Sequence, residues 1–191
     1  MTTLNIPPNL TLSLYLFKQC KLWVWDFDDT LINTDTYYKN DMTPAAIRER
    51  TDEQLTEEVP QWRYFRELAN YLVNNGRYVG IASFGTLEII RAYMNRIFGF
   101  NQKIFTDKNI IAPRYAQRNA ISIGRFTPPP NKNEYIYTLM RIYRVQDFKR
   151  VVLFDDNASN VADAIAVGII AIQIAAPSNG DKNSDQFFFG P

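Results

Sequence analysis

The sequence predicts a doubly wound α/β fold, a mostly parallel Rossmann-like sheet with helices on both faces and no full cap domain. Short apolar runs alternate with longer segments whose apolar residues recur at helical spacing, which is typical of strand–helix–strand units. Three apolar runs end directly in a polar residue: Asp26, Ser83 and Asp155. The chain has 191 residues, 46% of them hydrophobic, which is enough for one sizeable core.

The first half of the chain is expected to contribute two strands and two helices. The run Leu22–Trp25 predicts a buried strand, and 61–75 predicts a helix because its apolar residues are three or four positions apart. Those residues are Trp62, Phe65, Leu68, Ala69 and Leu72. A second strand is expected over Tyr78–Ala82, followed by a helix that ends near Phe98.

The second half continues the alternation. A short strand is expected at Lys103–Phe105, and a helix that Asn131 opens should bury Tyr135, Leu139 and Ile142 on one face. The remaining expected elements are a strand at Val151–Phe154, a helix at Ala158–Val167 and a strand at Ile169–Ile174. In such a sheet, functional sites lie at the carboxyl ends of the strands.

The composition excludes several kinds of chemistry. The sequence contains no histidine, so Ser-His and Cys-His catalytic pairs and imidazole zinc sites are excluded. Cys20 is the only cysteine, so no intramolecular disulfide can form. The net charge is +1, which excludes a polyelectrolyte role for the chain as a whole but says nothing about local patches. An enzyme of this composition has to work with carboxylates, lysines, hydroxyls and a hard metal ion.

The N-terminus does not have the features of a targeting segment. Met1–Cys20 is mildly apolar, but Pro7 and Pro8 interrupt it and no basic residue precedes Lys18. No stretch of the sequence reaches the apolar length of a membrane span. We therefore expect an intracellular, cytoplasmic protein with no membrane partner.

Acidic and hydroxyl side chains gather after the first strand. Asp26, Asp28, Asp29 and Thr30 lie within five positions. Asp and Thr often stabilise turns and cap helices, so a purely structural role is the alternative. Clustered carboxylates repel each other, however, and a bound hard cation with oxygen ligands is the ready way to hold them together at neutral pH.

Four motifs in the same order resemble those of the haloacid dehalogenase superfamily of phosphatases. Asp26-x-Asp28-x-Thr30 after an apolar strand is similar to the first motif, and Ser83 at a strand end is similar to the second. Lys132, after three prolines, is the candidate for the third, and the pair Asp155-Asp156 for the fourth. The resemblance spans residues 21–174. It is the ordered set that makes it specific, since one acidic turn alone would be weak.

The resemblance implies a role for each of these side chains. Asp26 would attack phosphorus and form an aspartyl-phosphate, and Asp28 would protonate the leaving oxygen and then activate water. Ser83 and Lys132 would bind the oxygens of the transferring phosphoryl group. The family's metal is Mg²⁺, with the Asp26 carboxylate, the Asp28 backbone carbonyl and a fourth-motif acid as ligands. Asp156 is the expected direct ligand and Asp155 a water-mediated one, an order that stays open.

Some assignments have competitors. Ser83 could simply cap a strand end, and Lys132 competes for the third motif with Lys108, Arg114 and Arg125. Thr30 is expected to support the turn, and Asp29 either to face solvent or to stabilise the turn. Asn160 is expected either to tune the metal shell or to cap a helix.

The gaps between motifs are too short for a full cap domain. After the first motif only 32–60 remains as a small insert, and 107–130 is expected to be irregular. We therefore expect one domain over 1–191, with its core at about 18–176 and a tail at 177–191 that ends in Phe187-Phe188-Phe189. The tail is expected either to be disordered or to dock its phenylalanines on the body or on a partner.

The segment Arg91–Arg144 has ten basic residues and two acidic ones, so it could attract a polyanionic substrate or simply balance the acidic first half. An open site suits a large phosphorylated substrate, either a phosphoprotein or a nucleic-acid end. The sequence predicts a Mg²⁺-dependent phosphatase. The alternatives are a phosphotransferase or nucleotidase that acts on a small metabolite, and an inactive module that binds a phosphorylated or nucleic-acid partner.

Overall fold

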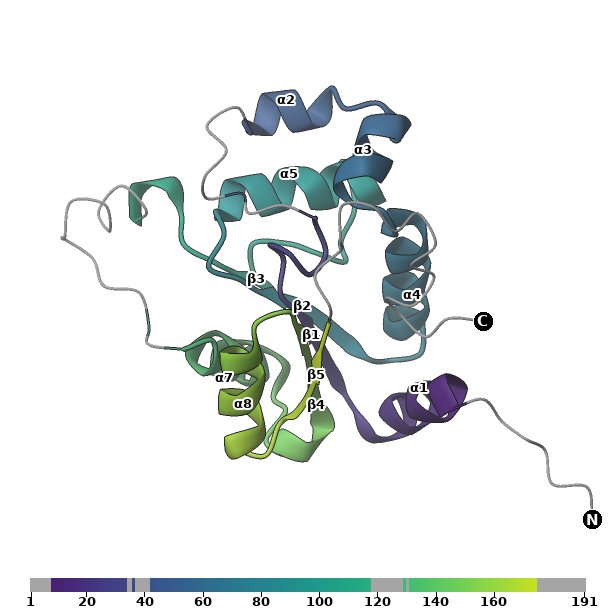
Figure 1. Cartoon of the computed structure of the whole chain (residues 1–191), viewed down its shortest axis with the longest axis vertical. Coiled ribbons are helices and arrows are strands. Elements are labelled where there is room, and N and C mark those ends of the chain that lie inside the picture. Colours follow the sequence, from purple (N-terminus) through teal and green to yellow (C-terminus); the bar gives the residue numbers. More distant parts are fainter. Residues whose placement is uncertain (1–7, 34–35, 37–41, 118–128, 130, 175–191) are drawn as a thin grey trace, which may run out of the picture.

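The computed structural model describes residues 8–33, 36, 42–117, 129 and 131–174, and its centre is a five-stranded sheet (Figure 1). The strands are β1 (Leu22–Trp25), β2 (Tyr78–Ala82), β3 (Ile110–Ile111), β4 (Val151–Asp155) and β5 (Ile170–Gln173). Every pairing is parallel, and the strand order is β3-β2-β1-β4-β5. The chain thus builds outward from β1 in both directions, which confirms the predicted doubly wound α/β fold.

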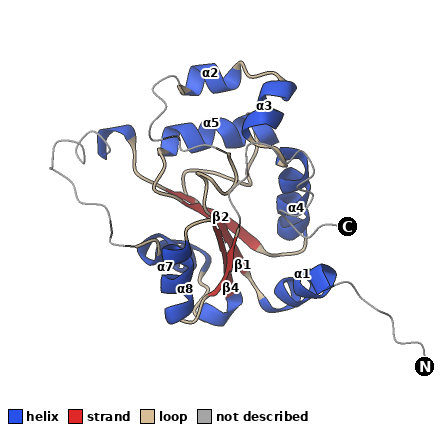
Figure 2. Cartoon of the chain, viewed as in Figure 1, coloured by secondary structure: helices blue, strands red, loops and turns tan. Residues whose placement is uncertain are grey.

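Helices cover both faces of this sheet (Figure 2). They are α1 (Pro8–Gln19), α2 (Pro44–Arg48), α3 (Asp52–Glu58), α4 (Trp62–Asn74), α5 (Leu87–Phe98), α7 (Asn133–Tyr143) and α8 (Ala158–Ala166), with a 3-10 turn, η1 (Phe148–Arg150), before β4. In the described part of the chain, no helix is both long and apolar enough to cross a lipid bilayer.

The alternation of side chains along β1 divides the core into two clusters. Trp23 and Trp25 belong to the cluster that α1, α4 and α5 cover, whereas Leu22 and Val24 belong to the cluster under α7 and α8. Successive side chains of a strand point to opposite faces, so a run with no polar residue is needed where both faces are covered. This is why the strands were recognisable as short, wholly apolar runs.

Two sequence expectations on local structure are wrong. Lys103–Phe105 is not a strand, because the Gln102 side-chain oxygen accepts hydrogen bonds from the backbone N–H groups of Ile104 (2.8 Å) and Phe105 (2.7 Å) and closes a turn. The third strand is Ile110–Ile111 instead.

The inner face of α7 also differs from the expected one. Ile142 is 43% exposed, and the buried stripe runs through Ile136, Leu139 and Met140. With α7 rotated in this way, Tyr143 lies against β2. Its ring stacks on Tyr78 with 4.5 Å between the ring centroids, and its hydroxyl donates a hydrogen bond to the Val79 carbonyl (3.0 Å).

The predicted small insert, 32–60, contains α2 and α3, which lie over α5 (Figure 1). Partly buried polar contacts fasten it there. Glu58 of α3 pairs with Arg50 (3.0 Å) and accepts a hydrogen bond from the fully buried Tyr93 of α5 (2.8 Å). Arg96 of α5 donates to the backbone carbonyl of Arg50 (3.0 Å). Two side chains of α5 therefore hold the insert against the body of the protein. Tyr93 contacts α3, and Arg96 contacts the backbone between α2 and α3.

Candidate active site

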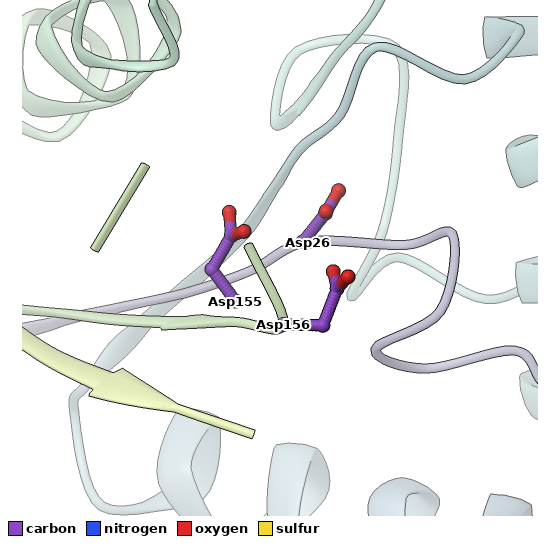
Figure 3. Close-up of side chains that lie close together, drawn as sticks. All are labelled: Asp26, Asp155 and Asp156. Carbon is purple, nitrogen blue, oxygen red and sulfur yellow. The ribbon is translucent and has the colours of Figure 1, made fainter. Parts of the chain in front are cut away.

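The carboxyl ends of β1 and β4 bring three predicted acids together. Asp26 follows β1, Asp155 ends β4 and Asp156 comes next, and one carboxylate oxygen from each lies within 4.8 Å of the others. Figure 3 shows these side chains projecting from the neighbouring strand ends. The register explains the approach, because Trp25 pairs with Phe154 and the next residues of both strands are these acids.

Lys132 connects two of these acids. It is the N-cap residue of α7, its side chain is 1% exposed, and its Nζ lies 2.6 Å from both Asp26 Oδ2 and Asp155 Oδ2. Burial opposes the charged ammonium, but the two carboxylates outweigh burial and raise the pKa of Lys132 above its ordinary value. Of its competitors, Lys108 and Arg114 are exposed, and Arg125 lies outside the described residues.

Asp26 is held by both of its carboxylate oxygens. Oδ1 accepts a hydrogen bond from the Phe27 amide (2.6 Å) and Oδ2 is paired with Lys132. Burial raises the pKa of Asp26 to about 7, and Lys132 opposes part of that rise. Burial therefore outweighs the neighbouring ammonium in setting the protonation of Asp26.

Asp155 and Asp156 have different surroundings. Asp155 is fully buried, and besides Lys132 it accepts hydrogen bonds on Oδ1 from the Asn157 amide (3.0 Å) and the Asn160 side chain (3.1 Å). Asp156 is partly exposed, and only its Oδ1 accepts a protein hydrogen bond among the described residues, from the Thr30 hydroxyl (3.1 Å). Asp156 is therefore the acid with an oxygen still available for a ligand.

Three polar residues near the acids shape the surrounding loops or orient Asp155. Thr30 bridges the loop after β1 to β4, because its hydroxyl also accepts a hydrogen bond from the Asp156 amide (3.0 Å). Asn160 orients Asp155, whereas the N-cap of α8 is Asn157. Asp29 adopts a left-handed backbone conformation (φ 54°), which Asp tolerates better than most residues, and so belongs to the turn.

Asp28 and Ser83 meet around a glycine. A Cβ at Gly85 would lie 2.8 Å from Asp28 Oδ2, 3.0 Å from Ser83 Oγ and 3.3 Å from Thr36 Oγ1. Ser83 is fully buried and accepts a hydrogen bond from the Gly85 amide (2.9 Å), while Asp28 Oδ1 accepts one from the Thr36 amide (3.1 Å). The absent side chain of Gly85 thus lets the expected acid and the expected phosphate-binding hydroxyl approach one another.

Thr36 and Gly85 are residues that the sequence did not identify. Thr36 is 6% exposed, and its hydroxyl has no hydrogen-bond partner among the described residues. Gly85 lies two positions after Ser83, but its closeness to Asp28 depends on a fold that brings together residues 57 positions apart in the sequence.

The donor set fits a hard divalent cation. All the candidate ligand atoms are oxygens, and three carboxylates face one ammonium. Mg²⁺ characteristically binds through one or two carboxylates and completes its shell with water or substrate phosphate oxygens. Asp156 and Asp26 suit that role better than Asp155, because each Asp26 oxygen has one partner, whereas the fully buried Asp155 has three.

Comparisons with known proteins give a match only at the level of structure. No family model and no curated protein matches the sequence. A Clostridium difficile protein, named provisionally as a phosphatase, is similar at 14% identity and a TM-score of 0.51, over 83% of this chain and 86% of that one. The haloacid-dehalogenase-family enzyme bt-2542 from Bacteroides thetaiotaomicron, solved with magnesium and inorganic phosphate, gives 15% identity and a TM-score of 0.46, over 84% and 96%.

DsGPDH from Dunaliella salina gives 16% identity and a TM-score of 0.46, and here the match covers 84% of this chain but 24% of that one, so the chain spans about a quarter of that protein. Identities this low show the fold alone. The chain shares its parallel α/β sheet fold with the Clostridium difficile protein, in agreement with the predicted fold class.

Proposed function

We propose that the protein is a Mg²⁺-dependent phosphatase that hydrolyses phosphate monoesters through an aspartyl-phosphate on Asp26. The observation that carries the proposal is the position of Lys132, which is buried and bonded at 2.6 Å to both Asp26 and Asp155. A buried ammonium beside a carboxylate at a strand end provides both a nucleophile and a group that stabilises phosphoryl charge. Asp156 lies beside Asp26, and Asp28 and Ser83 follow the carboxyl ends of β1 and β2 at the same edge of the sheet.

In the first step an Asp26 carboxylate oxygen attacks phosphorus and the bond from phosphorus to the ester oxygen breaks. Asp28, as a neutral acid, gives its proton to that oxygen, so that an alcohol leaves. In this proposal Lys132 and Ser83 bind the phosphoryl oxygens as charge develops on them. The product of the step is an acyl phosphate on Asp26 and a carboxylate on Asp28.

In the second step Asp28 accepts a proton from water, and the water oxygen attacks phosphorus. The bond between phosphorus and the Asp26 oxygen breaks, inorganic phosphate leaves, and Asp28 is again a neutral acid. Asp28 can serve in both steps because the Thr36 amide holds one of its oxygens while the other faces Ser83 across Gly85. The same carboxyl group therefore acts as the acid and then as the base.

Mg²⁺ is the metal ion that we propose for the site, held by Asp26, Asp156 and the backbone carbonyl of Asp28. When bound, the ion neutralises charge on the phosphoryl oxygens. We assign Asp155 to orienting Lys132 rather than to binding the ion directly. Its Oδ2 is paired with Lys132, and its Oδ1 accepts two hydrogen bonds from Asn157 and Asn160.

The test is phosphate release from a panel of monoesters with Mg²⁺ and with EDTA. The panel holds phosphopeptides, nucleotides, sugar phosphates and phosphorylated oligonucleotides. We expect release that needs Mg²⁺ and is lost in Asp26→Asn. Asp29→Asn is the matched control, because it makes the same chemical change on the same loop and Asn tolerates the left-handed conformation.

Other outcomes identify the alternatives. Phosphate passed to an added alcohol or nucleoside faster than to water would indicate a phosphotransferase. A protein that binds phosphorylated ligands with Mg²⁺ but turns over no ester in the panel would be an inactive binding module, and the proposal would be wrong.

Extended, multiply charged substrates are part of the same proposal. Three arginines of the basic segment, Arg114, Arg118 and Arg125, are proposed to attract such substrates. Arg114 is exposed beside Asp107, and Arg118 and Arg125 lie outside the described residues. Replacing all three with glutamine should raise KM for an acidic phosphopeptide or an oligonucleotide, less so at high salt, and leave KM for a small aryl phosphate unchanged. Equal losses on both would show that the basic segment has a structural role.

A further inference from the structure

Two aromatic rings lie beside the ammonium that is to bind the phosphoryl group. The Phe84 ring centroid lies 5.5 Å from Lys132 Nζ, and the Tyr135 ring lies 5.7 Å from the Phe84 ring, tilted by 57°. Phe84 comes directly after Ser83, and Tyr135 is one turn of α7 after Lys132. The pair therefore joins the two elements that carry the proposed phosphate-binding groups.

Neither ring is fully buried. Phe84 belongs to neither of the two core clusters of described residues, although it is a phenylalanine at the end of a central strand. Tyr135 is only partly buried and lies at the margin of the cluster beneath α7, whose inner stripe is Ile136, Leu139 and Met140. Both rings are partly exposed.

We propose that Phe84 and Tyr135 form a subsite for the leaving group of the substrate, and that this group is aromatic. The inference rests on the proposed function and names its substrate class: phosphate monoesters of phenols, such as a phosphotyrosyl side chain. Aromatic rings pair favourably with centroids about 4.5–7 Å apart, in tilted as well as offset-stacked arrangements. A phosphoryl group bound to Lys132 would place the ring of a phenolic ester within that range of Phe84.

The closeness of Phe84 to Lys132 favours a phenolic ester over a nucleotide. In a phenolic ester the ring is bonded directly to the bridging oxygen, so it lies next to the phosphoryl group. In a nucleoside 5′-phosphate a methylene and a ribose come between phosphorus and the base, which would carry the base past a ring that lies 5.5 Å from the ammonium. An alkyl ester such as phosphoserine has no ring to pair.

The experiment measures direct binding of two non-hydrolysable ligands by calorimetry, in Mg²⁺ and with the full chain. Phenylphosphonate carries the aromatic group and methylphosphonate does not, while both carry the oxyanions that Lys132 would bind. The variants are Phe84→Leu and Tyr135→Leu. Tyr137→Leu is the matched control, because Tyr137 lies on the same helix and forms a ring pair of nearly the same geometry with Phe148 (5.6 Å, 54°).

We expect each of the two variants to weaken phenylphosphonate about 2- to 10-fold, the range that one aromatic pair contributes. Methylphosphonate should change by less than about 2-fold, since its oxyanions do not touch the rings. Tyr137→Leu should change neither. The ratio of kcat/KM for a phosphotyrosine peptide to that for the matched phosphoserine peptide should fall by a similar factor in Phe84→Leu and Tyr135→Leu.

Three results would overturn the proposal. Equal weakening of both phosphonates would show that the rings only support Lys132. No weakening of either would show that no ligand ring reaches them, and a greater loss for a nucleoside monophosphate than for phenylphosphonate would assign the subsite to a base. Because binding is measured without turnover, selective binding by an inactive protein would support the subsite while refuting the proposed function.

Discussion

The charge state of Asp26 depends on its burial, on the nearby Lys132 ammonium and on any bound cation. In the metal-free protein burial raises the pKa of this carboxyl to about 7, whereas an unfolded aspartate has a pKa of about 3.9. Between these values the folded protein keeps a proton that the unfolded chain has lost. The contribution of Asp26 to the free energy of unfolding should therefore fall as the pH rises through this window, and level off above about pH 7.

Asp26→Asn should remove this pH dependence. In EDTA, the free energy of unfolding of Asp26→Asn minus that of the wild type should increase between about pH 4.5 and about pH 7.5, because only the wild type loses stability from this group. Urea unfolding at the two pH values measures it. A difference independent of pH would contradict the raised pKa. Adding Mg²⁺ at the higher pH should stabilise the wild type, and should stabilise Asp156→Ala less.

Gly85 is the residue whose replacement tests the geometry around Asp28 most sharply. The new methyl group of Gly85→Ala would lie 2.8 Å from Asp28 Oδ2 and 3.0 Å from Ser83 Oγ, so both side chains must move. We expect kcat to fall about 10- to 100-fold, because a shift of about 1 Å in a reacting group has an effect of that size. The loss should be greater for alkyl than for aryl phosphates, since alkyl leaving groups need the proton of Asp28.

Gly168→Ala is the control for that variant. Gly168 has a left-handed backbone (φ 91°), and a Cβ there would meet Phe148 at 3.8 Å, so alanine should lower stability without changing kcat. An active Gly85→Ala with wild-type kinetics would mean that Asp28 and Ser83 do not need their present arrangement.

Single residues were predictable where chain position alone determined their place. Asp26, Ser83 and Asp155 each follow an apolar run, and the carboxyl ends of parallel strands meet at one edge of the sheet. Thr36 and Phe84 were not assigned roles from the sequence. Each matters through its closeness to a segment distant in the sequence, Thr36 to Gly85 and Phe84 to Lys132. The closeness of Phe84 to Lys132 cannot be predicted from the spacing of residues in the sequence.

At the scale of elements, α2 and α3 of the insert are held to α5 by polar contacts. Tyr93→Phe deletes the hydroxyl that donates to Glu58 from a fully buried ring, while Arg50 still pairs with Glu58. We expect a loss of about 1 kcal/mol in the free energy of unfolding, which corresponds to a fall in Tm of about 2–4 °C for a chain of this size.

Activity should not follow that loss of stability. If the insert does not move during turnover, Tyr93→Phe should keep wild-type kcat and KM at a temperature where both proteins are folded. Tyr71→Phe, on the 55% exposed Tyr71 of α4, should leave Tm unchanged. A change in kcat with Tyr93→Phe would show instead that the insert takes part in the reaction.

Elements with long apolar periodicity were predictable and short ones were not. The helix at 61–75 matches α4 within a residue at each end, because its buried residues lie at regular spacing. The two helices of the insert are five and seven residues long and depend on Thr43 and Thr51 as caps. For α7 the sequence held two stripes of helical spacing, and packing of Tyr143 on Tyr78 selected the one without Ile142.

For the molecule as a whole, the topology explains why one edge of the sheet collects the chemistry. The chain leaves β1 toward β2 and β3, then returns to add β4 and β5 on the other side. At the resulting switch point the ends of β1 and β4 are neighbours, so Asp26 faces the Asp155-Asp156 pair although about 130 residues separate them in the sequence. The alternation of apolar runs predicted this architecture. The strand order and the close approach at the edge required the structure.

The central claim is that Asp26 becomes phosphorylated. Asp28→Asn tests it with an aryl phosphate as substrate, because a phenolate leaves without needing a proton from Asp28 whereas the attacking water still needs its base. The covalent intermediate should therefore accumulate in this variant in the presence of Mg²⁺. Acid quenching followed by tandem mass spectrometry locates it.

The account predicts one added phosphoryl group on Asp26, removed by hydroxylamine and absent from Asp26→Asn–Asp28→Asn protein. Turnover of the same aryl phosphate by the wild type, with no phosphoryl group on Asp26 in the quenched Asp28→Asn variant or with the group on another residue, would contradict it.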